Sequence, residues 1–260
     1  MILSCTTCSL RGRGRDEIEE TFRWAPEAGF AAWGLGGPFT WEPGLIQWLD
    51  TAKVKREAQT AGLTRLTEVW TPPIPTASPQ AASEGVRHIA LAAEAAVALD
   101  CDLLVQTGGP RAEGGLERTL GGLRQLDDVL GELPVRVALE PHMGSQILYA
   151  EEYDRLMAEL PFPRFGITVD TGHFHTAGVD WKALIRRYPD RIYNVHLKDH
   201  IGPQSVAIGA GEIDLPGLIA ELRAIEYTAA LAIEMEVTDP ENLHLYATQA
   251  HEYMVGLLGG

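Results

Sequence analysis

Apolar and polar residues follow two different spacings along this chain, and each spacing predicts one kind of element. Runs in which every second residue is apolar predict strands, whereas apolar residues three or four positions apart predict helices. The expected strands cover residues 2–7, 31–35, 63–70, 102–106, 135–140, 165–170, 192–198 and 230–236. The expected helices cover residues 16–28, 45–61, 82–99, 116–131, 149–160, 181–188, 215–224 and 241–257. Each expected strand is therefore followed by one helix.

Strict alternation of strands and helices predicts a parallel sheet, and eight such units in 260 residues are typical of a (β/α)8 TIM barrel. We therefore expect an α/β protein with a single barrel domain over residues 1–260. The length also suits two smaller domains, and an open doubly wound sheet is the alternative topology. That alternative is weakened because no G-x-G-x-x-G motif follows the first expected strand. The Pro- and Ser-rich segment 71–80 is long enough to form a mobile lid.

Four of the later strands carry a polar, ligand-type side chain at or near their C-terminal ends: Glu140, Asp170, His196 and Glu234. In each strand this residue lies on the face opposite the bulky aliphatic residues, because side chains alternate with a period of two. That parity directs the four side chains to the barrel interior, at the end of the strands where TIM-barrel active sites lie. We expect them to converge.

Three carboxylates buried together without a counter-charge would repel one another and take up protons. A divalent cation removes this repulsion. Oxygen ligands with one imidazole suit Mn²⁺ or Mg²⁺, with Co²⁺, Zn²⁺ or Fe²⁺ as alternatives. The competing interpretation places each acid on an exposed rim, paired with an arginine.

Four motifs occur in order along the second half of the chain: Glu140-Pro-His, Val169-Asp170-Thr-Gly-His173, Val195-His196-Leu-Lys198-Asp199 and Ile233-Glu234. Together they resemble the xylose-isomerase-like TIM-barrel superfamily, which includes sugar isomerases and epimerases, inosose dehydratases and the endonuclease IV group. The resemblance implies one metal ion bound by Glu140, Asp170, His196 and Glu234, and a substrate contact from His173. It also favours a homo-oligomer, a dimer or a tetramer.

Further residues narrow the subgroup. The segments Gly209-Ala-Gly211-Glu212-Ile-Asp214 and Glu234-Met-Glu236 resemble inosose dehydratases. Ketose 3-epimerases usually carry an arginine six residues after the ligand histidine, where this chain has Gly202. Endonuclease IV carries an Asp-x-His pair before the Gly-rich turn, and residues 203–208 contain neither residue type. A three-zinc site acting on DNA is therefore disfavoured.

We expect a sugar or polyol isomerase or epimerase that removes a proton next to a metal-held carbonyl and proceeds through an enediolate. Glu140 and Glu234 are the candidate proton carriers. Return of the proton from the opposite face gives epimerisation, and its return to the neighbouring carbon gives isomerisation. Loss of a β-hydroxyl gives dehydration, the alternative activity. The ligand set does not choose among these outcomes, and a non-catalytic metal-binding barrel is a further alternative.

His173 and Lys198 are the candidate substrate-binding residues. Either could orient substrate oxygens or donate a proton to a leaving hydroxyl. For Lys198, an ion pair with Asp199 or Glu236 is an equal alternative. His142 and His175 follow the strand ends closely, but capping of a loop is the favoured interpretation for both.

Two smaller features remain open. The backbone of Gly209-Ala-Gly211 could hold a phosphate, although a plain turn is favoured. Trp33, Trp41 and Trp70 lie near the ends of expected early strands, where they could line a sugar pocket or pack in the core.

Composition limits the partners. The formal charge of −15 and the lack of any basic run argue against binding to duplex DNA. No apolar run reaches the length of a membrane span, and the first residues lack a secretory pattern, so we expect a cytoplasmic protein with a small-molecule partner. Three cysteines cannot all pair, which fits a reducing compartment. Cys5-x-x-Cys8 resembles half a zinc knuckle, but without a second pair structural thiols are favoured.

Overall fold

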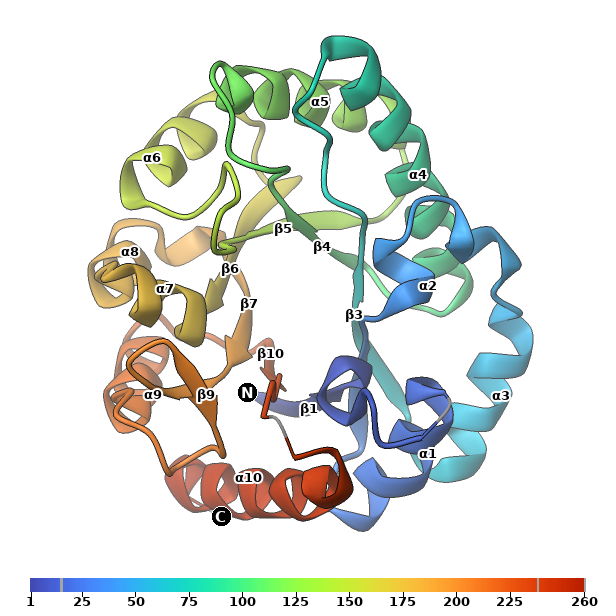
Figure 1. Ribbon diagram of the computed structural model, residues 1–260, viewed down its shortest axis with the longest axis vertical. Helices are drawn as coiled ribbons and strands as arrows, with labels where there is room; N and C mark the ends of the chain where they lie inside the picture. Colours follow the sequence, from blue (N-terminus) through green and yellow to red (C-terminus); the bar gives the residue numbers. More distant parts are fainter. Residues whose placement is uncertain (15, 238, 260) are drawn as a thin grey trace.

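The computed structural model describes residues 1–14, 16–237 and 239–259, and Figure 1 shows a ring of strands enclosed by helices. Eight parallel strands close into a barrel in the order β1-β10-β7-β6-β5-β4-β3-β2. They are β1 (Ile2–Thr6), β2 (Ala32–Leu35), β3 (Arg65–Trp70), β4 (Leu103–Thr107), β5 (Arg136–Glu140), β6 (Phe165–Asp170), β7 (Ile192–Leu197) and β10 (Ala230–Ile233). The closed barrel confirms the predicted fold.

Helices cover the outside of this barrel (Figure 1). They are α1 (Glu17–Glu27), α2 (Pro38–Trp41), α3 (Thr51–Ala61), α4 (Pro79–Ala98), α5 (Gly115–Leu130), α6 (Ala150–Glu159), α7 (Thr171–Ala177), α8 (Trp181–Arg187), α9 (Leu215–Ala224) and α10 (Leu243–Leu258). Short 3-10 turns add η1 (Thr7–Leu10), η2 (Leu45–Trp48), η3 (Pro189–Arg191) and η4 (Pro240–Asn242). An antiparallel hairpin, β8 (Asp199–Ile201) with β9 (Gln204–Val206), lies between β7 and α9.

The barrel strands separate apolar and polar side chains as their alternation predicts. The outward-facing aliphatic residues share one buried core with the surrounding helices; they include Val137, Leu139, Ile167, Val169 and Val195. The inward-facing positions are also buried but are largely polar; they include Glu68, Gln106, Glu140, Thr168, Asp170, Asn194 and His196. The barrel interior therefore concentrates groups that need partners or a ligand, because buried polar groups are costly when unpaired.

Aspartate caps determine where several helices begin. The carboxylates of Asp50, Asp180 and Asp214 each accept a hydrogen bond from the backbone N–H three residues later, which satisfies a donor that the helix itself cannot pair. Asp50 also explains a difference from the expected helix 45–61. The segment is divided into η2 and α3, with Leu49 in an extended conformation between them.

Three further elements differ from the sequence prediction. Neither the short helix α7, which follows Asp170 directly, nor the β8–β9 hairpin was expected. The last barrel strand ends at Ile233 rather than at residue 236. Glu234 nevertheless keeps the predicted orientation, because its backbone N–H donates to the Leu197 carbonyl at 3.0 Å.

The segment between β3 and α4, which we expected to be long enough for a mobile lid, packs against the barrel rim. Ile74 is fully buried and forms an isolated bridge with Gly108. The Thr71 hydroxyl donates to the Val105 carbonyl at 3.0 Å, and the Thr76 hydroxyl donates to the Pro110 carbonyl at 2.6 Å. These contacts fasten the segment to the neighbouring strand β4 and the loop that follows it.

Candidate metal centre

The four predicted ligand side chains meet at the C-terminal end of the barrel. One ligand atom from each of Glu140, Asp170, His196 and Glu234 lies within 4.8 Å of the others, and all four residues are buried. The Nδ1 atom of His196 is 2.6 Å from Glu140 Oε1 and 2.9 Å from Glu234 Oε2. Asp170 Oδ2 lies 3.9 Å from the same nitrogen. The competing interpretation, exposed acids paired with arginines, does not fit this burial.

Asp170 illustrates how the fold prepares a ligand atom. It is the last residue of β6, and its Oδ1 accepts the His173 backbone N–H at 2.7 Å, which caps α7. Its Oδ2 is buried and lies 3.2 Å from Lys198 Nζ, but it accepts no hydrogen bond of good geometry. Glu234 Oε2 is likewise buried; His196 Nδ1 is 2.9 Å away, but no hydrogen bond of good geometry reaches this oxygen. Two such carboxylate oxygens in one cluster are what a bound cation would satisfy.

The local charge supports the same conclusion. Within 4 Å of the two basic groups of the cluster, His196 and Lys198, lie five carboxylates: Glu68, Glu140, Asp170, Glu234 and Glu236. Burial raises the pKa of Glu140, and the nearby Glu234 and Asp170 raise it further, against the opposing effect of His196. A divalent cation would offset this excess of negative charge, so the residues present fit a metal ion.

Glu68 is a buried residue in contact with the cluster that no sequence motif indicated. It lies on β3, is fully buried, and its Oε2 is 2.9 Å from His196 Nε2. The same carboxylate accepts hydrogen bonds from the Asn194 amide and, at 3.2 Å, from Trp70 Nε1. With Nε2 facing Glu68, Nδ1 is the imidazole nitrogen directed at the other ligands. The inward-facing position of Glu68 in the third expected strand could have indicated this residue, but no sequence motif accompanied it.

Lys198 contacts two of the four predicted ligands, Asp170 and Glu234. Its ammonium is 2.9 Å from Glu234 Oε1, 3.2 Å from Asp170 Oδ2 and 3.4 Å from Glu236 Oε2. Burial lowers the pKa of Lys198, but Asp170 and Glu234 outweigh burial and hold that pKa well above its usual range. The ion pair with Glu236 that we weighed is present, whereas the Asp199 carboxylate accepts only backbone N–H groups.

His173 lies beside Lys198, with Nε2 at 3.2 Å from the ammonium. Burial lowers the pKa of His173 to about 4, so this imidazole is neutral near pH 7 and can accept a hydrogen bond from the lysine. Neither residue lines the cavity described below. Their roles as substrate contacts remain predictions.

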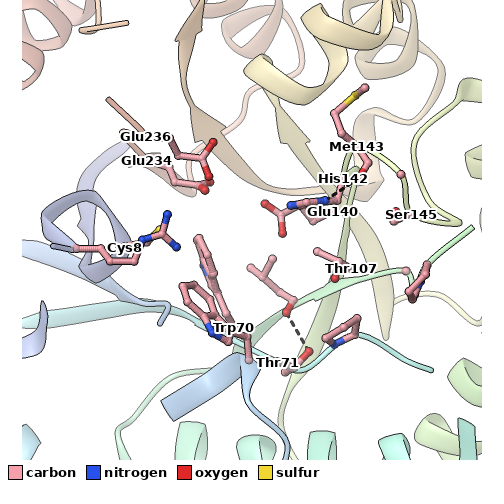
Figure 2. A pocket seen from close by; sticks show the side chains of 17 residues that line it. Cys8, Trp70, Thr71, Thr107, Glu140, His142, Met143, Ser145, Glu234 and Glu236 are labelled. Carbon is pink, nitrogen blue, oxygen red and sulfur yellow. Dashed lines mark hydrogen bonds between the residues drawn. The ribbon is translucent and has the colours of Figure 1, made fainter. Parts of the chain in front are cut away.

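A cavity of about 520 Å³ opens onto the cluster, a size typical of small-molecule sites. Figure 2 shows Glu234 and Glu236 on one side of it and Glu140 and His142 on the other. The apolar part of its wall includes Trp41, Trp70, Pro73, Val105, Pro110 and Met143. Trp33 instead packs in the core, edge-on to Phe22 at a centroid distance of 5.0 Å.

Two other candidate binding features are accounted for by the structure itself. The Gly209 and Gly211 N–H groups both donate to Asp199 Oδ2 at 2.9 Å, so this turn has its donors satisfied without a phosphate. Cys5 and Cys8 are free, buried thiols, and burial raises the pKa of both. In the described part of the chain, the only group of three or more suitable metal-ligand residues is the barrel cluster.

Comparison with known proteins gives a consistent result. A family model described as xylose isomerase-like TIM barrel matches residues 22–254. The inosose dehydratase of Geobacillus kaustophilus is 32% identical over 160 residues, which cover 53% of this chain and 51% of that protein. The rhizopine catabolism protein MocC of Rhizobium meliloti is 32% identical over 151 residues, covering 50% and 46%. The chain thus spans about half the length of the curated relatives it matches.

Solved structures share the fold at lower identity. The IolI protein with a bound zinc atom superposes with a TM-score of 0.81 at 14% identity, covering 99% of this chain and 98% of that one. The 3-keto-D-glucoside 4-epimerase YcjR from E. coli gives a TM-score of 0.77 at 19% identity, with 100% of each chain covered. No helix among the described residues is long and apolar enough to cross a membrane. With its barrel, its buried ligand cluster and a family match over most of its length, the chain belongs to the xylose isomerase-like TIM barrel family.

Proposed function

We propose that this protein is a divalent-metal-dependent enzyme that removes a proton from the carbon next to a carbonyl of a sugar-like or inositol-like substrate. The observation that carries the proposal is the buried cluster of Glu140, Asp170, His196 and Glu234, two of whose members, Glu140 and Glu234, line a cavity of about 520 Å³. When bound there, a cation such as Mn²⁺ or Mg²⁺ would supply positive charge that acidifies the C–H bond beside the substrate carbonyl.

Glu140 and Glu234 are the residues that would move the proton. They come from β5 and from the end of β10, and both line the cavity. One carboxylate accepts the proton from the substrate carbon, and the other is available to return it from another direction. Asp170 is held by the cap of α7 and Lys198 is enclosed by carboxylates, so these residues fix the geometry.

Two outcomes are compatible with this first step. Dehydration, in which the β-hydroxyl leaves as water, is favoured by the curated relatives named inosose dehydratase. Isomerisation or epimerisation is the second candidate. It is favoured because Glu140 and Glu234 lie on opposite sides of the cavity in Figure 2, so that the two carboxylates face the cavity from different directions. Both outcomes begin with the removal of the same proton from carbon.

The experiment measures the exchange of this proton with solvent deuterium and the loss of water from the substrate. Protein stripped of metal is reloaded with Mn²⁺, Mg²⁺, Co²⁺ or Zn²⁺ and incubated in D₂O with ketoses and an inosose, and products are read by NMR. We expect metal-dependent deuterium incorporation or loss of water, and a loss of at least about 100-fold in Glu234→Gln. Glu252→Gln, an exposed residue on α10, is the matched control. Unchanged activity in both Glu140→Gln and Glu234→Gln would rule out the proposal.

A further inference from the structure

Arg11 stands at the edge of the same cavity and has no role in the metal cluster. It follows η1 directly, it is exposed, and it is the only arginine or lysine among the described residues that line the cavity. Its guanidinium carbon lies 5.4 Å from the ring centre of Trp41. No carboxylate of a described residue lies within 4.0 Å of the guanidinium nitrogens. A positive charge thus faces the cavity without an ion-pair partner in direct contact among the described residues; Glu17, whose pKa burial raises and Arg11 partly lowers, lies beyond that distance.

Hydrogen bonds tie the turn that carries Arg11 to the strand end that carries Glu234. The Thr6 and Ser9 hydroxyls donate to the Ile233 carbonyl at 3.0 and 2.8 Å. The Met235 N–H in turn donates to the Ser9 hydroxyl at 3.0 Å. These bonds hold Ile233 and Met235, the chain neighbours of Glu234. The backbone that carries Arg11 is therefore fixed relative to this predicted ligand.

Hydrogen bonds also fix the segment that carries Trp41, whose indole ring lies beneath Arg11. The Thr7 hydroxyl donates to the Gly36 carbonyl at 2.6 Å and accepts the Gly36 N–H at 2.9 Å, which joins η1 to the segment leading into α2. Trp41, at the end of α2, lies 6.1 Å from Trp70, and Trp70 lies 5.4 Å from His196, as ring-centre distances. A row of flat side chains therefore runs from the guanidinium to the predicted metal ligand.

We propose that Arg11, held over Trp41, forms an anion subsite, so that the preferred substrate carries a carboxylate or a phosphate in addition to its reactive carbonyl. This inference rests on the proposed function, because it takes the carbonyl to lie at the metal cluster. The planar guanidinium offers paired N–H donors that match both anions, and stacking on an indole keeps it oriented. The other charged residues of the cavity wall are the acids Glu140, Glu234 and Glu236, so an anionic substituent has one favourable place to bind.

The test uses three ligands that differ at one carbon: D-fructose, D-fructuronate and D-fructose 6-phosphate. Their affinities for the Mn²⁺-loaded protein are measured by titration calorimetry. We expect at least one anionic member to bind about 10-fold or more tightly than D-fructose. In Arg11→Gln that preference should fall by about 10- to 100-fold, the range for a charged hydrogen-bonded contact. The carboxylate and phosphate arms show which anion the subsite takes.

Arg23→Gln is the matched control, because Arg23 is also an exposed arginine stacked on a tryptophan, with its guanidinium carbon 4.6 Å from the Trp24 ring centre. It lies outside the cavity wall, so the preference should be unchanged. Equal binding of the three ligands, absence of binding by all three, or a preference that survives Arg11→Gln would overturn the subsite. An anion preference that is present in the wild type and lost in Arg11→Gln, in a protein that shows no deuterium exchange, would instead count against the proposed function alone.

Discussion

Glu68 contacts His196 directly but is not itself one of the four predicted ligands, so its effect on the metal centre can be isolated. A carboxylate on the outer nitrogen of a ligand histidine orients the ring and raises its basicity. We predict that Glu68→Gln weakens metal affinity by about 10- to 100-fold, measured by chelator competition. Trp70→Phe, which removes one 3.2 Å hydrogen bond to Glu68 but keeps its carboxylate, should have a smaller effect. Equal affinities in wild type and Glu68→Gln would contradict the positioning role.

Lys198 allows a second prediction for a single residue. Replacing it by methionine leaves Asp170 and Glu234 buried beside each other without their shared cation. Breaking a buried ion pair in this way destabilises proteins by about 3–5 kcal/mol, and we expect this loss in the unfolding free energy measured with urea. Lys182→Met removes a partly exposed pair with Asp214 and should change stability by less than about 1 kcal/mol. Similar losses in the two variants would show that Lys198 is not a buried counter-charge.

For the element that follows β7, the organising residue is Asp199. Its carboxylate accepts N–H groups from His200, Gly209, Gly211 and Ile213, and it thereby holds the β8–β9 hairpin against the turn that leads into α9. We predict that Asp199→Ala lowers the unfolding free energy by at least about 1.5–3 kcal/mol, the contribution of one charged hydrogen bond.

The local consequence of Asp199→Ala can be measured by hydrogen exchange. The amides of Gly209 and Gly211 lose their acceptor, so they should exchange faster than in the wild type. Asp190→Ala, at an exposed position in η3, is the control and should leave both amides unaffected. Unchanged exchange at both glycines in Asp199→Ala would show that the turn holds its shape without the carboxylate.

For the whole molecule, metal binding should stabilise the fold, because the ligands come from separate strands that meet only in the native barrel. A ligand present at 100 times its Kd adds about 2.7 kcal/mol. For a chain of this size each kcal/mol raises Tm by about 2–4 °C. We therefore predict that removal of metal by a chelator lowers Tm by several degrees, measured by calorimetry.

The same measurement on Glu234→Gln provides the control for that prediction. Without one of its charged ligands, the cluster should bind metal weakly, so chelator and added metal should give closely similar Tm values. If the wild-type Tm is independent of metal under conditions where binding is saturated, the four side chains do not act as a site formed on folding.

Much of this molecule follows from local pattern. The period of two in strands 135–140, 165–170 and 192–198 placed Glu140, Asp170 and His196 on the inward face, and the structure brings these side chains together. Eight alternating units predicted the barrel, because parallel strands need crossover helices. The misses were short elements. The hairpin strands have three residues each, too few for a periodic signal, and α7 has one large apolar residue, Phe174, so it shows no helical spacing of apolar residues.

What the sequence alone determined is therefore the barrel and the direction of its polar side chains, since both depend on the alternation of neighbouring residues. What only the tertiary structure decided is which groups share an environment across distant strands. Glu68 is 128 residues from His196 and contacts it. Arg11 shares a cavity with Glu140 and Glu234 because the closed barrel brings β1 next to β10. Such contacts depend on closure of the sheet and on loop packing, which no local pattern encodes.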